Sequence, residues 1–180
     1  MLLINRMVKF SSALAVLLAV AVGSAFADHA KRFSNRLSDF KETAAELRQG
    51  ADLLDSHTRN TGLSWQTHNY QLTAMCDQVN ELGKRLADLE AQKAIATDAQ
   101  SLAIEHARPH LVAIADNLTR ALELIRENRQ NVYRPVYTEL VANIYDHADD
   151  LHVKMDTILD YESSRLRLDK LELKPLSQGS

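Results

Sequence analysis

Histidine is the residue type in this chain with the clearest potential for chemistry, and the sequence contains seven of them. His106 and His110 lie four residues apart, so on a helix both imidazoles project from one face and could chelate one ion. If that helix pairs antiparallel with the next, His152 falls in the same layer, with His147 and Asp150 within about a turn. Imidazoles beside carboxylates suit Zn²⁺ or Cu²⁺. We therefore take His106, His110 and His152 as candidate metal ligands; the alternative is that they are solvated surface residues.

A further histidine, His68, stands among apolar residues. Trp65, His68 and Leu72 follow the spacing of one helix face. We expect His68 to be at least partly buried and bonded to a neighbour, since buried polar groups need partners. A role in pH sensing or ligand binding is the alternative. The single cysteine, Cys76, follows Met75 at the edge of the same face, so we expect a buried, unreactive thiol rather than an intermolecular disulfide.

Tyrosine recurs in the C-terminal third of the chain. Tyr133, Tyr137, Tyr145 and Tyr161 are separated by 4, 8 and 16 residues. Such a stripe is typical of the border of a core. It could also form an edge where another protein docks, because tyrosine is enriched at interfaces.

Several cofactor and catalytic motifs are missing from the sequence. One cysteine excludes the C-x-x-C-H attachment motif of c-type haem. A di-iron bundle needs two E-x-x-H motifs and two further glutamates, whereas the nearest pattern here is one Asp149-x-x-His152. No P-loop, G-x-S-x-G or H-E-x-x-H motif occurs. The sequence thus predicts no catalytic residues, and no cofactor beyond the Zn²⁺ or Cu²⁺ that the histidines could bind.

Residues 1–27 predict a cleavable secretory signal peptide. Arg6 and Lys9 precede an apolar run over residues 10–22, and Ala25-Phe26-Ala27 has the small-x-small pattern that signal peptidase recognises. The run is about thirteen residues long, whereas a bilayer core needs roughly 20. We therefore expect cleavage after Ala27 rather than an uncleaved membrane anchor. The predicted destination is the periplasm or the extracellular medium.

The mature chain is predicted to be mildly acidic and free of internal disulfides. The whole chain has 180 residues and a formal net charge of -3, and losing the two cations of the leader takes the charge to -5. This balance does not suggest a nucleic-acid binder. An exported protein with one cysteine must derive its stability from packing, which a domain of about 150 residues can supply. No second apolar stretch is long enough to predict stable membrane insertion of the mature chain.

Apolar residues recur at alternating spacings of three and four along four segments, as they do on helices that pack through a heptad seam. The first two seams consist of Phe33, Leu37, Phe40, Ala44, Leu47, Ala51 and Leu54, and of Trp65, His68, Leu72, Met75, Val79, Leu82, Leu86 and Leu89. The last two consist of Ile104, Ala107, Leu111, Ile114, Leu118, Ala121 and Ile125, and of Tyr137, Leu140, Ile144, Ala148, Leu151, Met155 and Ile158. The one-residue drift near Ala148 is expected when a straight helix meets a seven-residue repeat.

Residues that begin or end helices divide the segments. Gly62, preceded by Asn60, predicts the end of the first helix through a glycine cap. Thr97 and Gln100 match a capping box, and Pro135 fits the start of the fourth helix. Because the linkers between segments are short, neighbouring helices must run antiparallel.

The sequence therefore predicts an all-α, up-down-up-down four-helix bundle over residues 28–174, followed by a disordered tail at residues 175–180. Pro109 lies opposite the third seam, so a kink there would open outward. The leucines after Tyr161 lose clean spacing but could extend the fourth helix to Pro175. The alternative is a long two-helix coiled coil with breaks.

These observations favour an exported, non-enzymatic bundle that acts by binding a protein or a ligand, through an envelope partner or self-association. A metal-binding bundle that uses His106, His110 and His152 is the second hypothesis. An enzyme with a pocket near His68 and Trp65 is the third.

Overall fold

The structure is a computed structural model that describes the backbone of residues 8–172 and the side chains of residues 28–169 and 171. Over the described residues the chain is helical and contains no strand. Four long helices account for most of it: α1 (Val8–Thr58), α2 (Trp65–Ala91), α3 (Asp98–Glu127) and α4 (Pro135–Glu172). Two short 3₁₀ helices, η1 (Lys93–Ile95) and η2 (Arg129–Tyr133), lie in the second and third connections. The prediction of an all-helical chain is confirmed.

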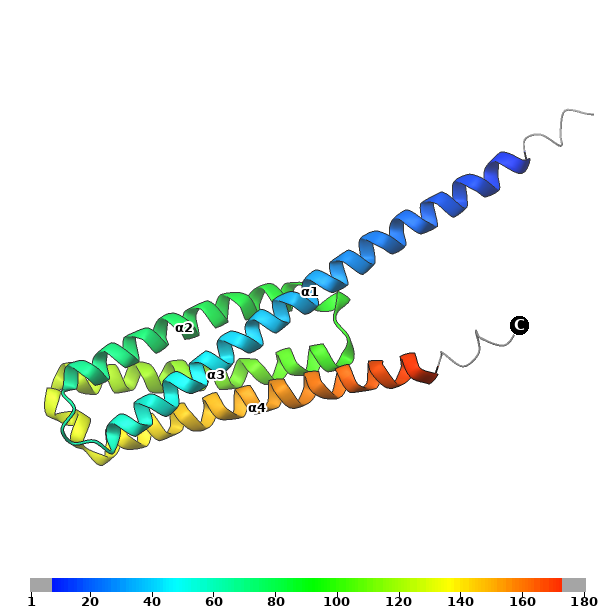
Figure 1. The fold of residues 1–180 in the computed structure, drawn as a ribbon. Helices are drawn as coiled ribbons and strands as arrows, with labels where there is room; N and C mark the ends of the chain where they lie inside the picture. Colours follow the sequence, from blue (N-terminus) through cyan, green and yellow to red (C-terminus); the bar gives the residue numbers. More distant parts are fainter. Residues whose placement is uncertain (1–7, 173–180) are drawn as a thin grey trace, which may run out of the picture.

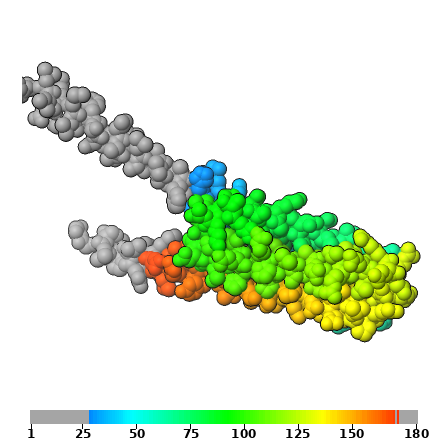
Figure 2. Space-filling view, turned by 180° about the vertical axis from the view of Figure 1, so that it is seen from behind, coloured from blue at the N-terminus to red at the C-terminus, as the bar shows by residue number. Residues whose placement is uncertain are grey.

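The four long helices pack side by side as a bundle (Figure 1). α1 packs against α2 and α4, and α3 packs against the same two helices. Each helix runs opposite to the one before it (Figure 1). Seen from behind, α3 lies between α2 and α4, and all three expose one face (Figure 2).

The buried residues of the bundle are those that the heptad spacing marks. Every predicted seam position of α1 and α3 is buried, as are those of α2 except the half-buried Trp65, and those of α4 up to Met155. Burial of each large aliphatic or aromatic side chain contributes about 1.5–3 kcal/mol. Pro109 is exposed, as predicted, so the donor that it lacks does not disturb the core.

Helix ends agree with the sequence in position but not always in mechanism. Thr97 and Gln100 form the predicted capping box at the start of α3, and Pro135 is the first residue of α4. α1 ends at Thr58, but no described residue has a positive φ, so Gly62 does not act as a left-handed cap. Instead, the amide of Gly62 donates to the side-chain oxygen of Asn60, 3.1 Å away, and this bond closes the turn.

The predicted leader overlaps the start of α1. The helix is continuous from Val8 and therefore crosses the expected cleavage point after Ala27. Residues 1–7 and the tail predicted at residues 175–180 lie outside the described residues. Within the described part of the chain, no helix combines the length and the apolar character needed to cross a membrane. Signal cleavage remains a prediction.

The two ends of the bundle differ. At the end that we call the closed end, the α1–α2 turn lies beside η2, which joins α3 to α4 (Figure 1). At the open end lies the α2–α3 connection, and both α1 and α4 continue past it while diverging from each other (Figure 1). The divergence of α1 and α4 separates two helices that pack closely farther down the bundle.

Candidate functional site

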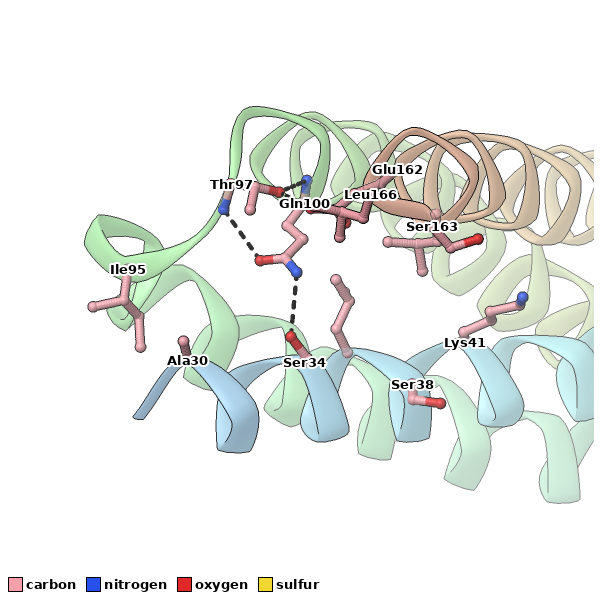
Figure 3. A pocket seen from close by; sticks show the side chains of 12 residues that line it. Ala30, Ser34, Ser38, Lys41, Ile95, Thr97, Gln100, Glu162, Ser163 and Leu166 are labelled. Carbon is pink, nitrogen blue, oxygen red and sulfur yellow. Dashed lines mark hydrogen bonds between the residues drawn. The ribbon is translucent and has the colours of Figure 1, made fainter. Parts of the chain in front are cut away.

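The open end contains a cavity of about 400 Å³ between α1, the start of α3 and the C-terminal part of α4 (Figure 3). Its walls combine aliphatic side chains with hydroxyl, amide and charged groups. The residues that line it are Ala30, Ser34, Leu37, Ser38, Lys41, Ile95, Thr97, Gln100, Leu159, Glu162, Ser163 and Leu166. Ligand pockets commonly have volumes of about 300–1,000 Å³, so this cavity lies at the small end of that range.

Small side chains form much of the α1 wall of the cavity. Ala30, Ser34 and Ser38 follow one another at intervals of four, which places them along one helix face. Across from them, α4 presents Ser163 and the half-exposed Leu166. Where the helices diverge, the small side chains of α1 and Ser163 of α4 are too short to fill the space between α1 and α4.

The capping box of α3 forms the polar end of the cavity. The Gln100 side-chain oxygen accepts a bond from the Thr97 backbone amide at 3.1 Å. The Gln100 backbone amide donates in turn to the Thr97 hydroxyl at 3.2 Å. The Gln100 side-chain nitrogen then donates to the hydroxyl of Ser34 at 3.3 Å, across the gap between α3 and α1 (Figure 3). The Thr97 hydroxyl donates to Glu162 at 2.5 Å. One N-terminal cap therefore connects three helices around the cavity.

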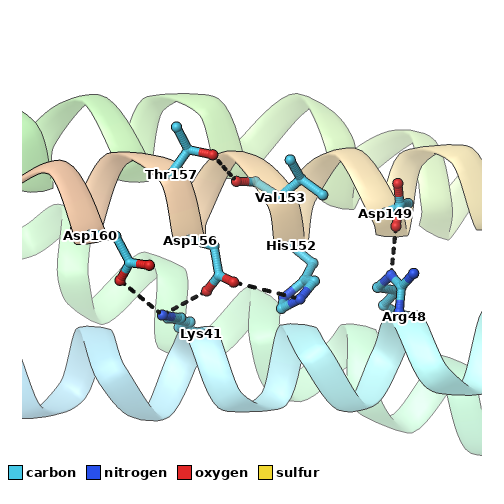
Figure 4. A network of polar contacts seen from close by, with 8 residues as sticks. All are labelled: Lys41, Arg48, Asp149, His152, Val153, Asp156, Thr157 and Asp160. Atoms are coloured by element: carbon cyan, nitrogen blue, oxygen red, sulfur yellow. Dashed lines mark hydrogen bonds and ion pairs between the residues drawn. The ribbon is translucent and has the colours of Figure 1, made fainter.

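The charged groups of the cavity are distributed unevenly. Lys41 is held by two carboxylates of α4, Asp156 at 2.6 Å and Asp160 at 3.8 Å (Figure 4). Glu162 is half-buried, and in the described part of the chain no cation lies within ion-pair distance of it. The wall thus contains one neutralised ammonium and one carboxylate that has no cationic partner among the described side chains.

Two further hollows lie beside the cavity on the other side of α4. One, of about 310 Å³, shares Thr97, Glu162 and Leu166 with the cavity. The next, of about 410 Å³, is lined by Leu102 and Tyr161, whose side chains are 45% and 67% exposed. α4 therefore has incomplete packing on both sides where it passes the open end, and apolar side chains remain exposed there.

The three histidines predicted as metal ligands do not form a common site. His110 is nearly buried, and its Nδ1 lies 3.4 Å from Nδ1 of His147 on α4. His152 instead lies in the polar network between α1 and α4, 3.8 Å from Asp156 (Figure 4). His106 is exposed on α3. Among the described residues, no three His, Cys, Asp or Glu side chains are close enough together to hold a metal ion.

His110 has a cationic neighbour on the side away from His147. The Lys154 ammonium donates to Nε2 of His110 at 3.1 Å, which leaves the Nδ1 proton of a neutral His110 to bond His147. Burial, with a smaller contribution from Lys154, lowers the pKa of His110. A metal ion bound at Nδ1 of His110 would have to displace this proton, and the Lys154 ammonium would repel it. The predicted antiparallel alignment of α3 and α4 is correct in bringing His110 opposite this part of α4. The histidine that His110 meets there is His147, however, and not His152.

The prediction for His68 is confirmed. Its side chain is 1% exposed, and its Nδ1 lies 3.1 Å from the hydroxyl of Tyr137, which is itself completely buried. The ring of His57 stands at 73° to that of His68, with centroids 5.8 Å apart. Burial lowers the pKa of His68 and raises that of Tyr137, so both side chains are neutral near pH 7.

The remaining candidates from the sequence are Cys76 and the tyrosine stripe, and they lie in the core, against it or on the surface. Cys76 is half-buried against the core, and burial raises the pKa of its thiol, which favours the unreactive protonated form. Of the tyrosine stripe, Tyr137 is in the core and Tyr145 packs against it, whereas Tyr133 and Tyr161 are exposed. The stripe therefore borders the core only over its middle part.

Sequence reasoning missed the polar residues of the cavity. Ser34 and Glu162 belong to no motif, and Gln100 gave a signal only as part of the capping box, which indicated a helix start. Neither the known family models, nor curated proteins, nor solved structures include a significant match to this chain. The function must therefore be argued from the geometry of the chain alone.

Proposed function

We propose that this chain is an exported, non-enzymatic helical bundle that acts by binding, and that its binding site is the open-end cavity. The observation that carries the proposal is the cavity of about 400 Å³ itself, bounded by three helices in a bundle whose described seam positions are almost all buried. The exposed apolar side chains beside it, including Leu102 and Tyr161, add surface that a bound molecule could cover.

Export is the part of the proposal that depends on the sequence. The leader-like pattern of residues 1–27 supports it. Intact-mass measurement of the accumulated protein tests it: we expect a chain that begins at Asp28. A mass equal to that of the complete 180-residue chain would contradict cleavage.

Non-enzymatic binding is supported by the chemistry of the cavity. Three of its four hydroxyl groups are held in structural bonds: Ser34 accepts from Gln100, Thr97 caps α3, and Ser163 donates to the Asp160 carbonyl at 3.0 Å. None is bonded to a histidine that could remove its proton, as an activated nucleophile requires. The lining is better suited to hold a molecule than to transform it.

The proposal is tested by isolating the protein under native conditions and identifying what copurifies, for the parent chain and two variants at Ser34. Ser34→Leu fills the cavity, whereas Ser34→Ala removes the bond from Gln100 without filling it. We expect a copurifying molecule with the parent and Ser34→Ala, and its loss with Ser34→Leu. A copurifying molecule that survives Ser34→Leu unchanged would place binding elsewhere and refute the site.

The metal alternative has less support. Of the three candidate ligands, His110 is the one that meets a second imidazole, that of His147, and the neighbouring Lys154 ammonium would repel a metal ion bound there. Titration calorimetry with Zn²⁺ and Cu²⁺ tests this directly. Affinity tighter than about 10 μM that is lost in His110→Ala would revive the alternative.

A further inference from the structure

The open-end cavity has a shape and charge that specify a class of ligand. We propose that it binds a small organic cation with an apolar chain, of the primary alkylammonium class, with the ammonium at Glu162 and the chain along Leu37 and Leu159. This inference rests on the proposed function, because it takes the same cavity and names what occupies it.

The volume favours a small molecule over a protein segment. About 400 Å³ equals a cube with an edge of about 7 Å, whereas a helix with its side chains is about 10–12 Å across. At roughly 30 Å³ for each water-sized group, the cavity holds on the order of a dozen non-hydrogen atoms. A single aliphatic chain with one polar head has that size.

The aliphatic wall accounts for the chain of the ligand. Leu37 is almost fully buried in the core, and Ile95 and Leu159 pack against the core from the α2–α3 connection and from α4. Leu166 is 49% exposed at the mouth of the cavity. A hydrocarbon chain placed here removes apolar area from water on both partners, which contributes about 25 cal/mol for each Å² buried.

The charges of the lining select a cation over an anion. Lys41 is already paired with Asp156 and Asp160, so it has no unpaired charge to offer a carboxylate or phosphate. The N-terminus of α3, which would otherwise attract an anion, has two amides bonded within the capping box. Glu162 interacts with the Thr97 hydroxyl rather than with a cation, so an ammonium can approach its carboxylate.

The position of Glu162 brings the charge and the chain together. Glu162 and Leu159 are separated by three residues on α4 and therefore occupy one face of the helix. Leu166 is four residues beyond Glu162 on that face. A ligand whose head bonds Glu162 thus has apolar side chains on both sides of it.

Titration calorimetry of the protein, in the form that the cell accumulates, tests the inference with three probes that share one chain: decylammonium, decanoate and 1-decanol. We expect saturable binding of decylammonium with a Kd below about 100 μM, and binding of decanoate at least tenfold weaker. Equal affinities for the ammonium and the alcohol would overturn the charge assignment. Tighter binding of decanoate would overturn it as well.

Variants locate the binding. Glu162→Gln is expected to weaken decylammonium binding about tenfold and to leave 1-decanol unchanged. Its matched control, Glu139→Gln, changes an exposed carboxylate at the other end of α4 and is expected to have no effect. Ser34→Leu is expected to abolish binding of every probe, because it fills the cavity that Ser34 lines. Loss of decylammonium binding in Glu139→Gln to the same degree as in Glu162→Gln would show nonspecific attraction to an acidic surface and refute the site.

The outcome separates this inference from the proposed function. If no probe binds but the copurifying molecule is still lost in Ser34→Leu, the cavity is a binding site for another chemical class and the cation assignment fails alone. If decylammonium binds and Ser34→Leu does not affect it, that binding takes place outside the cavity and the cation assignment fails; the proposed site fails with it when the copurifying molecule also survives Ser34→Leu.

Discussion

The closed and open ends of this bundle are formed by the same four helices and continue the same seams, yet they are packed differently. At the closed end, Arg129 lies over the ring of Trp65 at 4.5 Å, and the Tyr133 hydroxyl donates to the Leu63 carbonyl at 2.8 Å. There the buried Asn131 also bonds the last turn of α3. At the open end, short side chains line diverging helices and a cavity remains. Packing therefore depends on the side chains and connections at each end, and not on the seam alone.

The largest expected effect compares two leucines. Leu54 is fully buried near the closed end, whereas Leu166 is 49% exposed at the cavity mouth. Leu54→Ala should lower the free energy of unfolding by about 2–5 kcal/mol, because it removes core contacts and leaves a void. Leu166→Ala should cost less than about 1 kcal/mol. Urea unfolding measures both, and equal losses would mean that the two ends are equally packed.

The buried His68 near the closed end should make the free energy of unfolding depend on pH. Burial holds the pKa of His68 below its usual value, so its neutral form is favoured in the folded state. The contribution of His68 to the free energy of unfolding is therefore fully present above about pH 6.5, the pKa of histidine in the unfolded chain. It is lost as the pH falls through the lower pKa that His68 has in the folded chain. His57 and Tyr137, which face His68, supply no carboxylate to offset the charge.

Unfolding free energies measured between pH 7 and pH 5 check this dependence. The parent chain should lose stability toward pH 5, and His68→Gln should reduce the slope. The slope should not vanish, because burial also lowers the pKa of His110. A slope that His68→Gln leaves unchanged would show that His68 is as easily protonated in the folded chain as in the unfolded one.

A smaller effect is expected from the hydroxyl of Tyr137. Tyr137→Phe keeps the buried ring and removes the 3.1 Å contact with His68. Loss of one buried hydrogen bond costs about 0.5–1.5 kcal/mol. Thermal unfolding of the variant measures this cost. A variant as stable as the parent would indicate that His68 finds another partner.

The smallest effect is expected on the surface between α1 and α4. Arg48 donates to Asp149 at 2.5 Å, but both side chains are more than one third exposed. Because solvent screens such pairs, Arg48→Met should change the free energy of unfolding by no more than about 1 kcal/mol. A larger loss, measured by urea unfolding, would mean that this network matters as much as the core.

The fold could be predicted from the sequence because burial follows the helical repeat. Phe33 to Leu54 on α1 and Ile104 to Ile125 on α3 are buried at every predicted seam position. The capping box at Thr97 was equally local and equally predictable. The mechanism of the first turn was not, because Asn60 closes it by a side-chain bond without a left-handed glycine.

The candidate site could not be predicted because it depends on the distance between helices. Antiparallel register placed His110 level with α4 correctly, but a shift of less than two turns exchanged His152 for His147 as its neighbour. The cavity arises where α1 and α4 diverge, and no spacing in the sequence encodes that divergence. Ser34 and Glu162 gain significance only when the two helices are seen together (Figure 3).

The central claim, that the open end has more space between its helices than the closed end, is tested most directly by adding the same side chain at each end. Ser34 lines the cavity, whereas Ala51 is fully buried in the seam of α1. Urea unfolding should show Ser34→Leu within about 0.5 kcal/mol of the parent, and Ala51→Leu destabilised by about 1–3 kcal/mol through overpacking. If Ser34→Leu destabilises the chain as much as Ala51→Leu does, the open end is filled and the account is contradicted.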